Sequence, residues 1–118
     1  MKNAIVDKSF EFAVAVVKLT RKLREVSRDY ELAKQLVRSG TSIGANVSEA
    51  QQAQSRKDFI SKMSIALKEA NETRYWLKLL LRVDDIHKSY YETLIKDVEE
   101  IINLLVSIVK TAKGNEGS

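Results

Sequence analysis

Proline is absent from the chain, and apolar residues recur at alternating intervals of three and four positions through four long segments. This interval matches the 3.6-residue turn of an α-helix, and proline is the residue that a helix interior tolerates least. The segments span about residues 7–26, 29–54, 55–82 and 89–113, with short polar turns between them. Long helices joined by short turns favour an all-α fold, an antiparallel up-down-up-down four-helix bundle.

Three of the predicted helices begin at residues that can cap a helix. Asp29 precedes the second helix, Ser55-Arg56-Lys57-Asp58 resembles a capping box before the third, and Ser89-Tyr90-Tyr91-Glu92 is a Ser-x-x-Glu box before the fourth. Such side chains accept hydrogen bonds from backbone N–H groups that the first helical turn leaves without a partner. We expect one domain over residues 1–113 and a disordered polar tail over residues 114–118.

The glycines at positions 40 and 44 mark a special surface in the second helix. Each costs a helix about 1 kcal/mol relative to alanine, which indicates that this backbone must approach another closely. The alternative is a loop over residues 39–42. Beyond Gly40, Ile43, Val47 and Ala50 form a core-facing stripe at helical spacing.

A second stripe on the same helix is polar. Its residues can meet polar residues of the third helix, and buried polar groups must be hydrogen-bonded. We therefore predict a structural polar network rather than a reactive site. Its predicted members are Ser42, Asn46, Glu49, Glu69 and Glu72, with Arg74 beside them.

The core prediction is one apolar stripe per helix, which is all that a lone bundle needs. The inward residues are Phe12, Val16, Leu19, Leu23 and Val26; Leu32, Leu36, Ile43, Val47 and Ala50; Phe59, Met63, Ala66, Ala70, Thr73, Leu77 and Leu80; and Tyr91, Leu94, Val98, Ile101, Leu105, Ile108 and Ala112. The last two helices carry further apolar residues, which predicts a homo-oligomer interface that includes Trp76, Leu79, Leu104 and Val106. The alternative is a wide core stripe with a few exposed apolar residues.

Positive charge is concentrated in the first part of the chain. Residues 1–82 carry 16 Lys/Arg against 9 Asp/Glu, whereas residues 83–118 carry 4 against 7, so that the total of +4 conceals a +7 segment. The cations near the ends of the first and third helices should meet at one end of the bundle, where they can contact phosphates. The alternative is that they complement helix dipoles and keep the surface soluble. The candidate nucleic-acid-binding residues are Lys18, Arg21, Lys22, Arg24, Arg28, Arg74, Lys78 and Arg82.

Composition also argues against other classes of protein. Cysteine is absent, and the longest apolar run, residues 12–17, is too short to span a bilayer, so we expect a cytoplasmic protein without a membrane partner. The only histidine, His87, falls in a predicted turn beside Asp84 and Asp85, where it has no second histidine to share a metal and no positioned nucleophile. We expect no catalytic residue, no metal and no cofactor.

Three segments together resemble a known family. They are Ser42 to Ala50, Arg56 to Phe59 and Ile65 to Leu77, and they resemble the bacterial proteins of the 23S ribosomal RNA intervening-sequence family, also called S23. The resemblance implies a helical bundle that assembles as a homopentamer, with the accessory variability protein of diversity-generating retroelements as a relative. It also implies RNA or DNA binding through a basic surface, without enzymatic activity. An oligomeric scaffold that binds another protein is the alternative.

Overall fold

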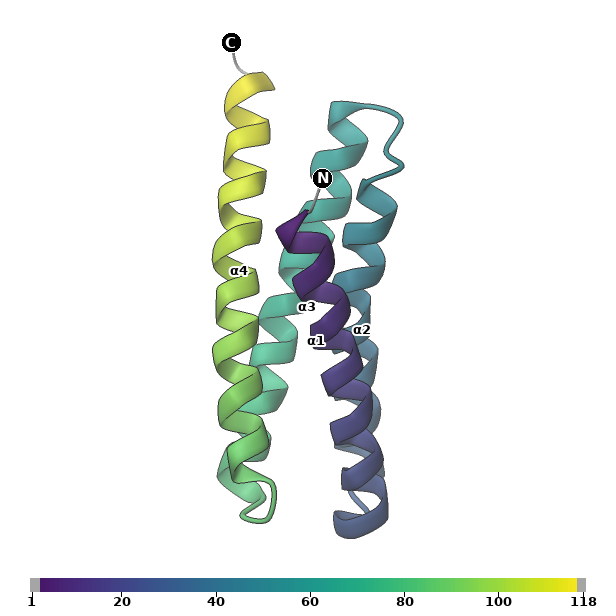
Figure 1. The fold of residues 1–118 in the computed structure, drawn as a ribbon, viewed down its shortest axis with the longest axis vertical. Coiled ribbons are helices and arrows are strands. Elements are labelled where there is room, and N and C mark those ends of the chain that lie inside the picture. The colour runs from purple at the N-terminus through teal and green to yellow at the C-terminus, as the bar shows by residue number, and fades with distance from the viewer. Residues whose placement is uncertain (1–2, 117–118) are drawn as a thin grey trace.

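The computed structural model describes residues 3–116, and four long antiparallel helices account for nearly all of them (Figure 1). They are α1 (Ala4–Lys22), α2 (Tyr30–Ala50), α3 (Arg56–Val83) and α4 (Lys88–Glu116), and a short π-helical segment, η1 (Leu23–Ser27), extends α1. Within the described residues there is no β-strand, and the molecule measures 51 × 26 × 21 Å. The predicted all-α, up-down-up-down four-helix bundle is confirmed.

Two of the three predicted caps are present. The Asp29 carboxylate accepts a hydrogen bond from the Leu32 amide at 3.3 Å, and Ser55 Oγ accepts one from the Asp58 amide at 3.0 Å. The Ser89 capping box is wrong. Ser89 already lies inside α4, where its carbonyl accepts a hydrogen bond from Thr93 Oγ1. The first amides of the helix, those of Tyr90 and Tyr91, donate instead to the carbonyl of His87.

Two of the differences from the predicted helix boundaries have a visible local cause. The second helix ends at Ala50 rather than Gln54, because the next amides bond three residues back and tighten the chain into a turn. The π-helical segment adds a residue to the last turn of α1, which rotates later side chains around the axis. Val26, predicted to face the core, is therefore 56% exposed.

Helix α2 runs unbroken through both glycines, so the alternative of a loop over residues 39–42 is wrong. The helix lies against α1 here. A Cβ on Gly44 would stand 3.1 Å from the backbone oxygen of Ser9, and one on Gly40 would stand 2.8 Å from a methyl group of Val16. The close helix approach inferred from the glycines is thus present, against backbone at one position and a buried side chain at the other.

The predicted stripes form most of the core. Four predicted members, Leu32, Phe59, Ile108 and Ala112, are only partly buried, and Val26 is exposed. The largest fully buried side chains come from all four helices and include Val16, Leu36, Leu77 and Tyr91. The bundle has one continuous hydrophobic core.

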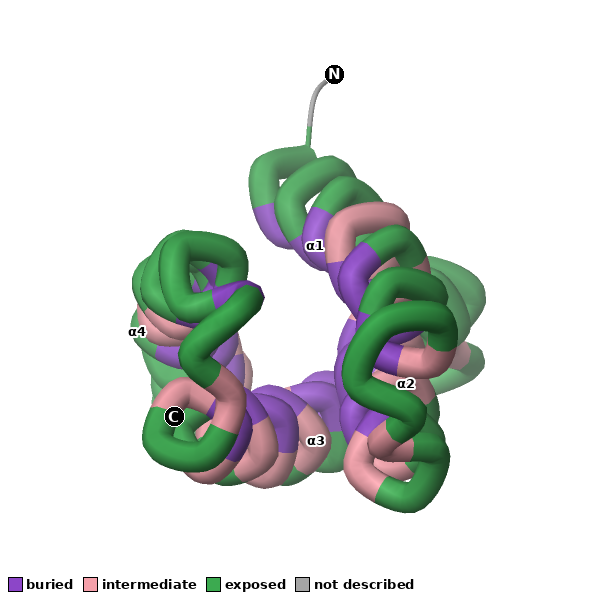
Figure 2. Tube along the Cα trace, turned by 90° about the horizontal axis from the view of Figure 1, so that it is seen from below, coloured by how far each residue is buried: buried purple, intermediate pink, exposed green. Residues whose placement is uncertain are grey.

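The helices follow one another around the bundle axis in chain order, so that α1 and α3 are diagonal neighbours (Figure 2). Helix α1 packs least closely against α4, while α2, α3 and α4 pack tightly in sequence. Residues 114–116, assigned to the tail from sequence, continue α4, and residues 117–118 lie outside the described residues.

Candidate nucleic-acid interface

The predicted basic residues of the first helix lie near the end of the bundle where the chain turns into α2 (Figure 1). Lys18, Arg21, Lys22 and Arg28 are exposed and Arg24 is partly buried. Among the described residues none of these five forms an ion pair, although the Lys22 ammonium lies 5.5 Å from the centre of the Tyr90 ring. Their charges are available to a ligand.

The predicted basic residues of the third helix separate into two environments. Arg74 faces α4, where its guanidinium lies 4.0 Å from a Glu99 oxygen and donates to Asn71 Oδ1 at 3.0 Å. Lys78 and Arg82 are exposed. Since α1 and α3 are diagonal, their cations reach the same end of the bundle but occupy different sides of it (Figure 2).

A cationic surface extends along the whole of α3. We call it the α3 outer face, and it consists of exposed residues at helical spacing, namely Lys57, Ser61, Ile65, Lys68, Asn71, Tyr75, Lys78 and Arg82. No exposed residue of α3, which the structure describes throughout, is acidic. From Lys57 to Arg82 this face is about 38 Å long at 1.5 Å per residue.

Lys57, Lys68 and Tyr75, the other charged and aromatic residues of this face, are not among the binding residues predicted from the sequence. The signal was present, since residues opposite the predicted core stripe of this helix fall at these positions. Among the described residues, the cations of the α3 outer face form no ion pair with a carboxylate.

The carboxylates of α3 have other partners, which is why its outer face is uniformly cationic. Asp58 accepts a hydrogen bond from the Gln54 amide at the start of the helix. Glu69 and Glu72 both bind the Arg38 guanidinium of α2, with 3.3 Å between Arg38 Nη1 and Glu69 Oε2. Because Glu69 and Glu72 lie on the side of α3 that faces α2, the outer face of α3 contains only cationic, polar and apolar residues.

The predicted polar residues of α2 bond mostly within their own helix. Ser42 Oγ donates to the Arg38 carbonyl at 2.6 Å, and Asn46 Nδ2 donates to the Ser42 carbonyl at 2.8 Å. Glu49 reaches α3 through an ion pair with Lys62 at 3.7 Å.

Two buried hydroxyls outside the predicted polar network link α2 to α3; one of them, Thr73, was predicted only as a core residue. Thr73 Oγ1 donates to Ser39 Oγ at 2.9 Å, and both residues are fully buried. With Arg38 and its two carboxylate partners, they fix the contact between the two helices.

The four predicted interface residues differ in exposure. Trp76 and Leu104 are partly buried and pack against the core, and Leu79 is partly buried. Val106, on the second half of α4, is 47% exposed. Of the four, Val106 is the one that is exposed.

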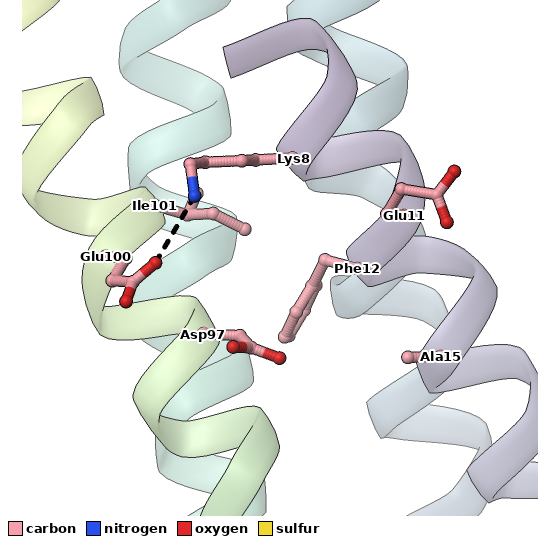
Figure 3. Close-up of a pocket in the computed structure, with 7 residues that line it drawn as sticks. All are labelled: Lys8, Glu11, Phe12, Ala15, Asp97, Glu100 and Ile101. Carbon is pink, nitrogen blue, oxygen red and sulfur yellow. Dashed lines mark hydrogen bonds and ion pairs between the residues drawn. The ribbon is translucent and has the colours of Figure 1, made fainter. Parts of the chain in front are cut away.

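A hollow of about 210 Å³ opens between α1 and α4, where the helices pack least closely (Figure 3). Phe12 points across it from α1, and the Asp97 carboxylate faces it from α4. An ion pair of 3.4 Å between Lys8 Nζ and Glu100 Oε2 bridges the two helices above it (Figure 3). Partial burial, and then the Glu100 carboxylate, raise the pKa of Asp97.

Polar side chains also organise the connection between α3 and α4. Asp84 accepts from the Tyr91 hydroxyl at 2.6 Å and the Ile86 amide at 2.9 Å, and lies 2.8 Å from His87 Nδ1. Burial alone would raise the pKa of Asp84, but hydrogen bonds from Tyr91 and His87 outweigh it and lower that pKa. Burial, and then the bond to Asp84, raise the pKa of Tyr91.

His87, predicted to lie in a polar turn, is therefore a buried member of this cluster, 5% exposed. The hydrogen bonds of the cluster all lie within the connection or between it and the start of α4. The cluster therefore has a structural role, which is to hold the α3–α4 connection in place. In the described part of the chain, no group of three or more histidine, cysteine or acidic side chains is placed to hold a metal ion. No described helix is long and apolar enough to cross a membrane.

Comparison with known proteins identifies the fold and the family. The family model described as "23S rRNA-intervening sequence protein" matches residues 1–107. A crystal structure of a protein with unknown function from the S23 ribosomal protein family of Bacteroides thetaiotaomicron is 55% identical, with a TM-score of 0.86 over 90% of this chain and 98% of that one. No curated protein matches the chain. The resemblance seen in the sequence is confirmed, while the relation to the retroelement protein stays a prediction.

Proposed function

This chain belongs to the family of 23S rRNA-intervening sequence proteins, and from the cationic surface of α3 we propose that it binds RNA or DNA without being an enzyme. It acts in the bacterial cytoplasm as a self-associating bundle. Its ligand is recognised mainly by its phosphates rather than by its base sequence.

The α3 outer face is the observation that carries this proposal. Five exposed cations lie on α3, namely Arg56, Lys57, Lys68, Lys78 and Arg82. The carboxylates of the helix are all partly buried and bind other partners. Cations without carboxylate partners can neutralise phosphates and release the counterions condensed on them, which supplies most non-specific affinity for nucleic acids. A surface meant only to stay soluble would mix both signs of charge.

The cations near the end of the first helix form a second cationic group. Lys18, Arg21, Lys22 and Arg28 are exposed near the same end of the bundle as Lys78 and Arg82. A single bundle presents the two groups on different sides. In an oligomer, cationic groups of several copies could contact one nucleic-acid strand. Once one copy has bound the strand, the effective concentration of the strand at the other copies is high, which strengthens overall binding.

The test measures affinity for a generic RNA against salt concentration. If phosphates are the target, log affinity falls linearly with log salt, by about 0.7 to 0.9 for each phosphate neutralised. The double variant Lys68→Glu/Lys78→Glu should weaken binding to unrelated sequences alike and reduce the slope. The variant Arg21→Glu/Arg24→Glu tests the contribution of α1 and η1.

A matched control is Lys110→Glu/Lys113→Glu, which makes the same change of charge at exposed positions of α4. Its binding should fall less than that of the α3 variant. If the unmodified protein shows no binding at about 50 mM salt, where phosphate contacts are strongest, the proposal is wrong. A scaffold for another protein is then the function to pursue.

Self-association is the second part of the proposal. Its support is the apolar surface on the second half of α4, where Val106 is 47% exposed and Leu104 lies at a surface hollow. The number of subunits, five, rests on the family resemblance alone.

A further inference from the structure

Tyr75 lies in the second half of the α3 outer face and is 60% exposed. Lys68 and Asn71 precede it by seven and four residues and Lys78 follows it by three, spacings that place all four side chains on one face of the helix. Along the axis the two lysines lie about 10 Å before and about 4.5 Å after the tyrosine. An aromatic ring thus lies between two cations that have no carboxylate partner among the described residues.

The neighbours of Tyr75 restrict its ring. Trp76 meets it edge to face, with 5.1 Å between the ring centres and 74° between the planes. The indole of Trp76 packs against the core and donates through Nε1 to Glu72 Oε2 at 3.3 Å. Glu72 in turn binds Arg38 of α2. A ring supported in this way loses little conformational freedom when a ligand covers it.

We infer that the α3 outer face binds an unpaired nucleic-acid strand, with a base stacked on Tyr75 and phosphates on Lys68 and Lys78. This rests on the proposed function and names its ligand class. In a duplex the bases are stacked on one another, so an exposed tyrosine on a convex helix gains nothing from them. In a single strand the base faces are accessible, and an aromatic side chain between cations is the usual means of binding them.

The experiment compares a single-stranded oligouridine of about 15 nucleotides with an RNA duplex of equal phosphate number. Tyr75→Ala should weaken binding to the single strand about 5- to 100-fold and leave duplex binding within about twofold. Tyr75→Phe keeps the ring and should retain affinity. Tyr30→Ala is the matched control, since it removes a tyrosine that is exposed to almost the same extent, at 59%, and lies outside the α3 outer face.

Each outcome separates this inference from the proposal beneath it. If Lys68→Glu/Lys78→Glu weakens both probes while Tyr75→Ala changes neither, the phosphate-binding function stands and base stacking is wrong. An equal loss from Tyr30→Ala, or equal losses on both probes from Tyr75→Ala, also rejects stacking on α3. If the unmodified protein binds neither probe, nucleic-acid binding itself fails. Circular dichroism of each variant checks that the helices remain intact.

Discussion

At the scale of single residues, the absence of a side chain can matter as much as its presence. Gly44 places the backbone of α2 against the backbone of α1 at Ser9, and backbone cannot move aside locally. Gly40 lies against Val16, a β-branched side chain that is fully buried and has few alternative rotamers. Both glycines lower helix propensity, and both permit a closer contact than alanine would.

Alanine at either position should therefore destabilise the protein, although alanine favours helix by about 1 kcal/mol. Overpacking costs about 1 to 3 kcal/mol, so we expect a net loss of up to about 2 kcal/mol in the free energy of unfolding, measured in urea. For Gly40→Ala, a second substitution, Val16→Ala, removes the methyl groups that the new Cβ would meet. The double variant should lose less than the sum of its parts. A stabilised Gly44→Ala would show that α1 and α2 can separate at no cost.

The Asp84 cluster makes stability depend on pH. The pKa of the Asp84 carboxyl in the folded state lies below its ordinary value of 3.8. The charged carboxylate therefore stabilises the fold fully at pH values above 3.8. This contribution is lost as pH falls through the folded-state pKa. Asp84→Asn should lower the free energy of unfolding by about 1 to 3 kcal/mol at pH 7.

The difference between Asp84→Asn and the unmodified protein should persist down to about pH 4 and then shrink. Asp85→Asn is the control, because Asp85 is exposed and takes part in none of these hydrogen bonds. Unfolding curves at several pH values measure both. A difference that stayed constant below pH 3 would show that the hydrogen bonds do not need the charge.

At the scale of elements, the end of α1 departs most from regular geometry. The π-helical segment is followed by Arg28 in the left-handed region, with φ 56° and ψ 26°. It is the only non-glycine residue with positive φ among those described. A side chain in this conformation costs about 1 to 2 kcal/mol, and glycine avoids that cost.

Arg28→Gly should therefore raise the free energy of unfolding by about 1 kcal/mol. Arg28→Ala keeps the Cβ and removes only the charge, so it should be less stable than the glycine variant. Thermal or urea unfolding of the two variants provides the comparison. Equal stabilities would mean that the turn relaxes when the arginine is removed. In a salt-dependent RNA-binding assay, both variants should bind more weakly if Arg28 contacts phosphate.

At the scale of the whole molecule, the proposed self-association surface and the cationic surface lie on different helices. The α3 outer face is cationic, whereas Val106 lies on α4 and exposes nearly half of its surface. An assembly formed through the second half of α4 would leave the α3 outer face open to a ligand. Oligomerisation and nucleic-acid binding can then be changed independently.

Val106→Asp should disperse the oligomer to a species near 13.4 kDa in light scattering while the helical signal remains, since a charge in an apolar contact is costly to desolvate. Leu104→Asp should do the same and also lower stability, because Leu104 packs against the core. A single-subunit mass for the unmodified protein at micromolar concentration would refute self-association. An unchanged oligomer in Val106→Asp would place the interface elsewhere.

Local patterns were enough to predict the bundle, its core and two of its caps, because helical spacing and capping depend on neighbours in sequence. The exposure of Val26 was not predictable in this way, since it depends on a π-helical segment that no local signal marked. The prediction of a cap at Ser89 was wrong because the hydrogen bonds that begin α4 involve His87, which Asp84 holds in place and which precedes the predicted capping box. The pairing of Glu69 and Glu72 with Arg38 depends on how two helices align, and it decides which charges face outward.

The loose contact between α1 and α4 has a consequence for how the chain folds. The close helix pairs all join helices that are consecutive in the chain. The contact between α1 and α4 joins the first helix to the last and is much looser. Short-range pairs form quickly, whereas a long-range contact must wait for the chain to close on itself. During synthesis α1, α2 and α3 can pack together before α4 leaves the ribosome, and α4 then docks on α3. Native-state hydrogen exchange should accordingly find the amides at the start of α1 among the least protected in the helices.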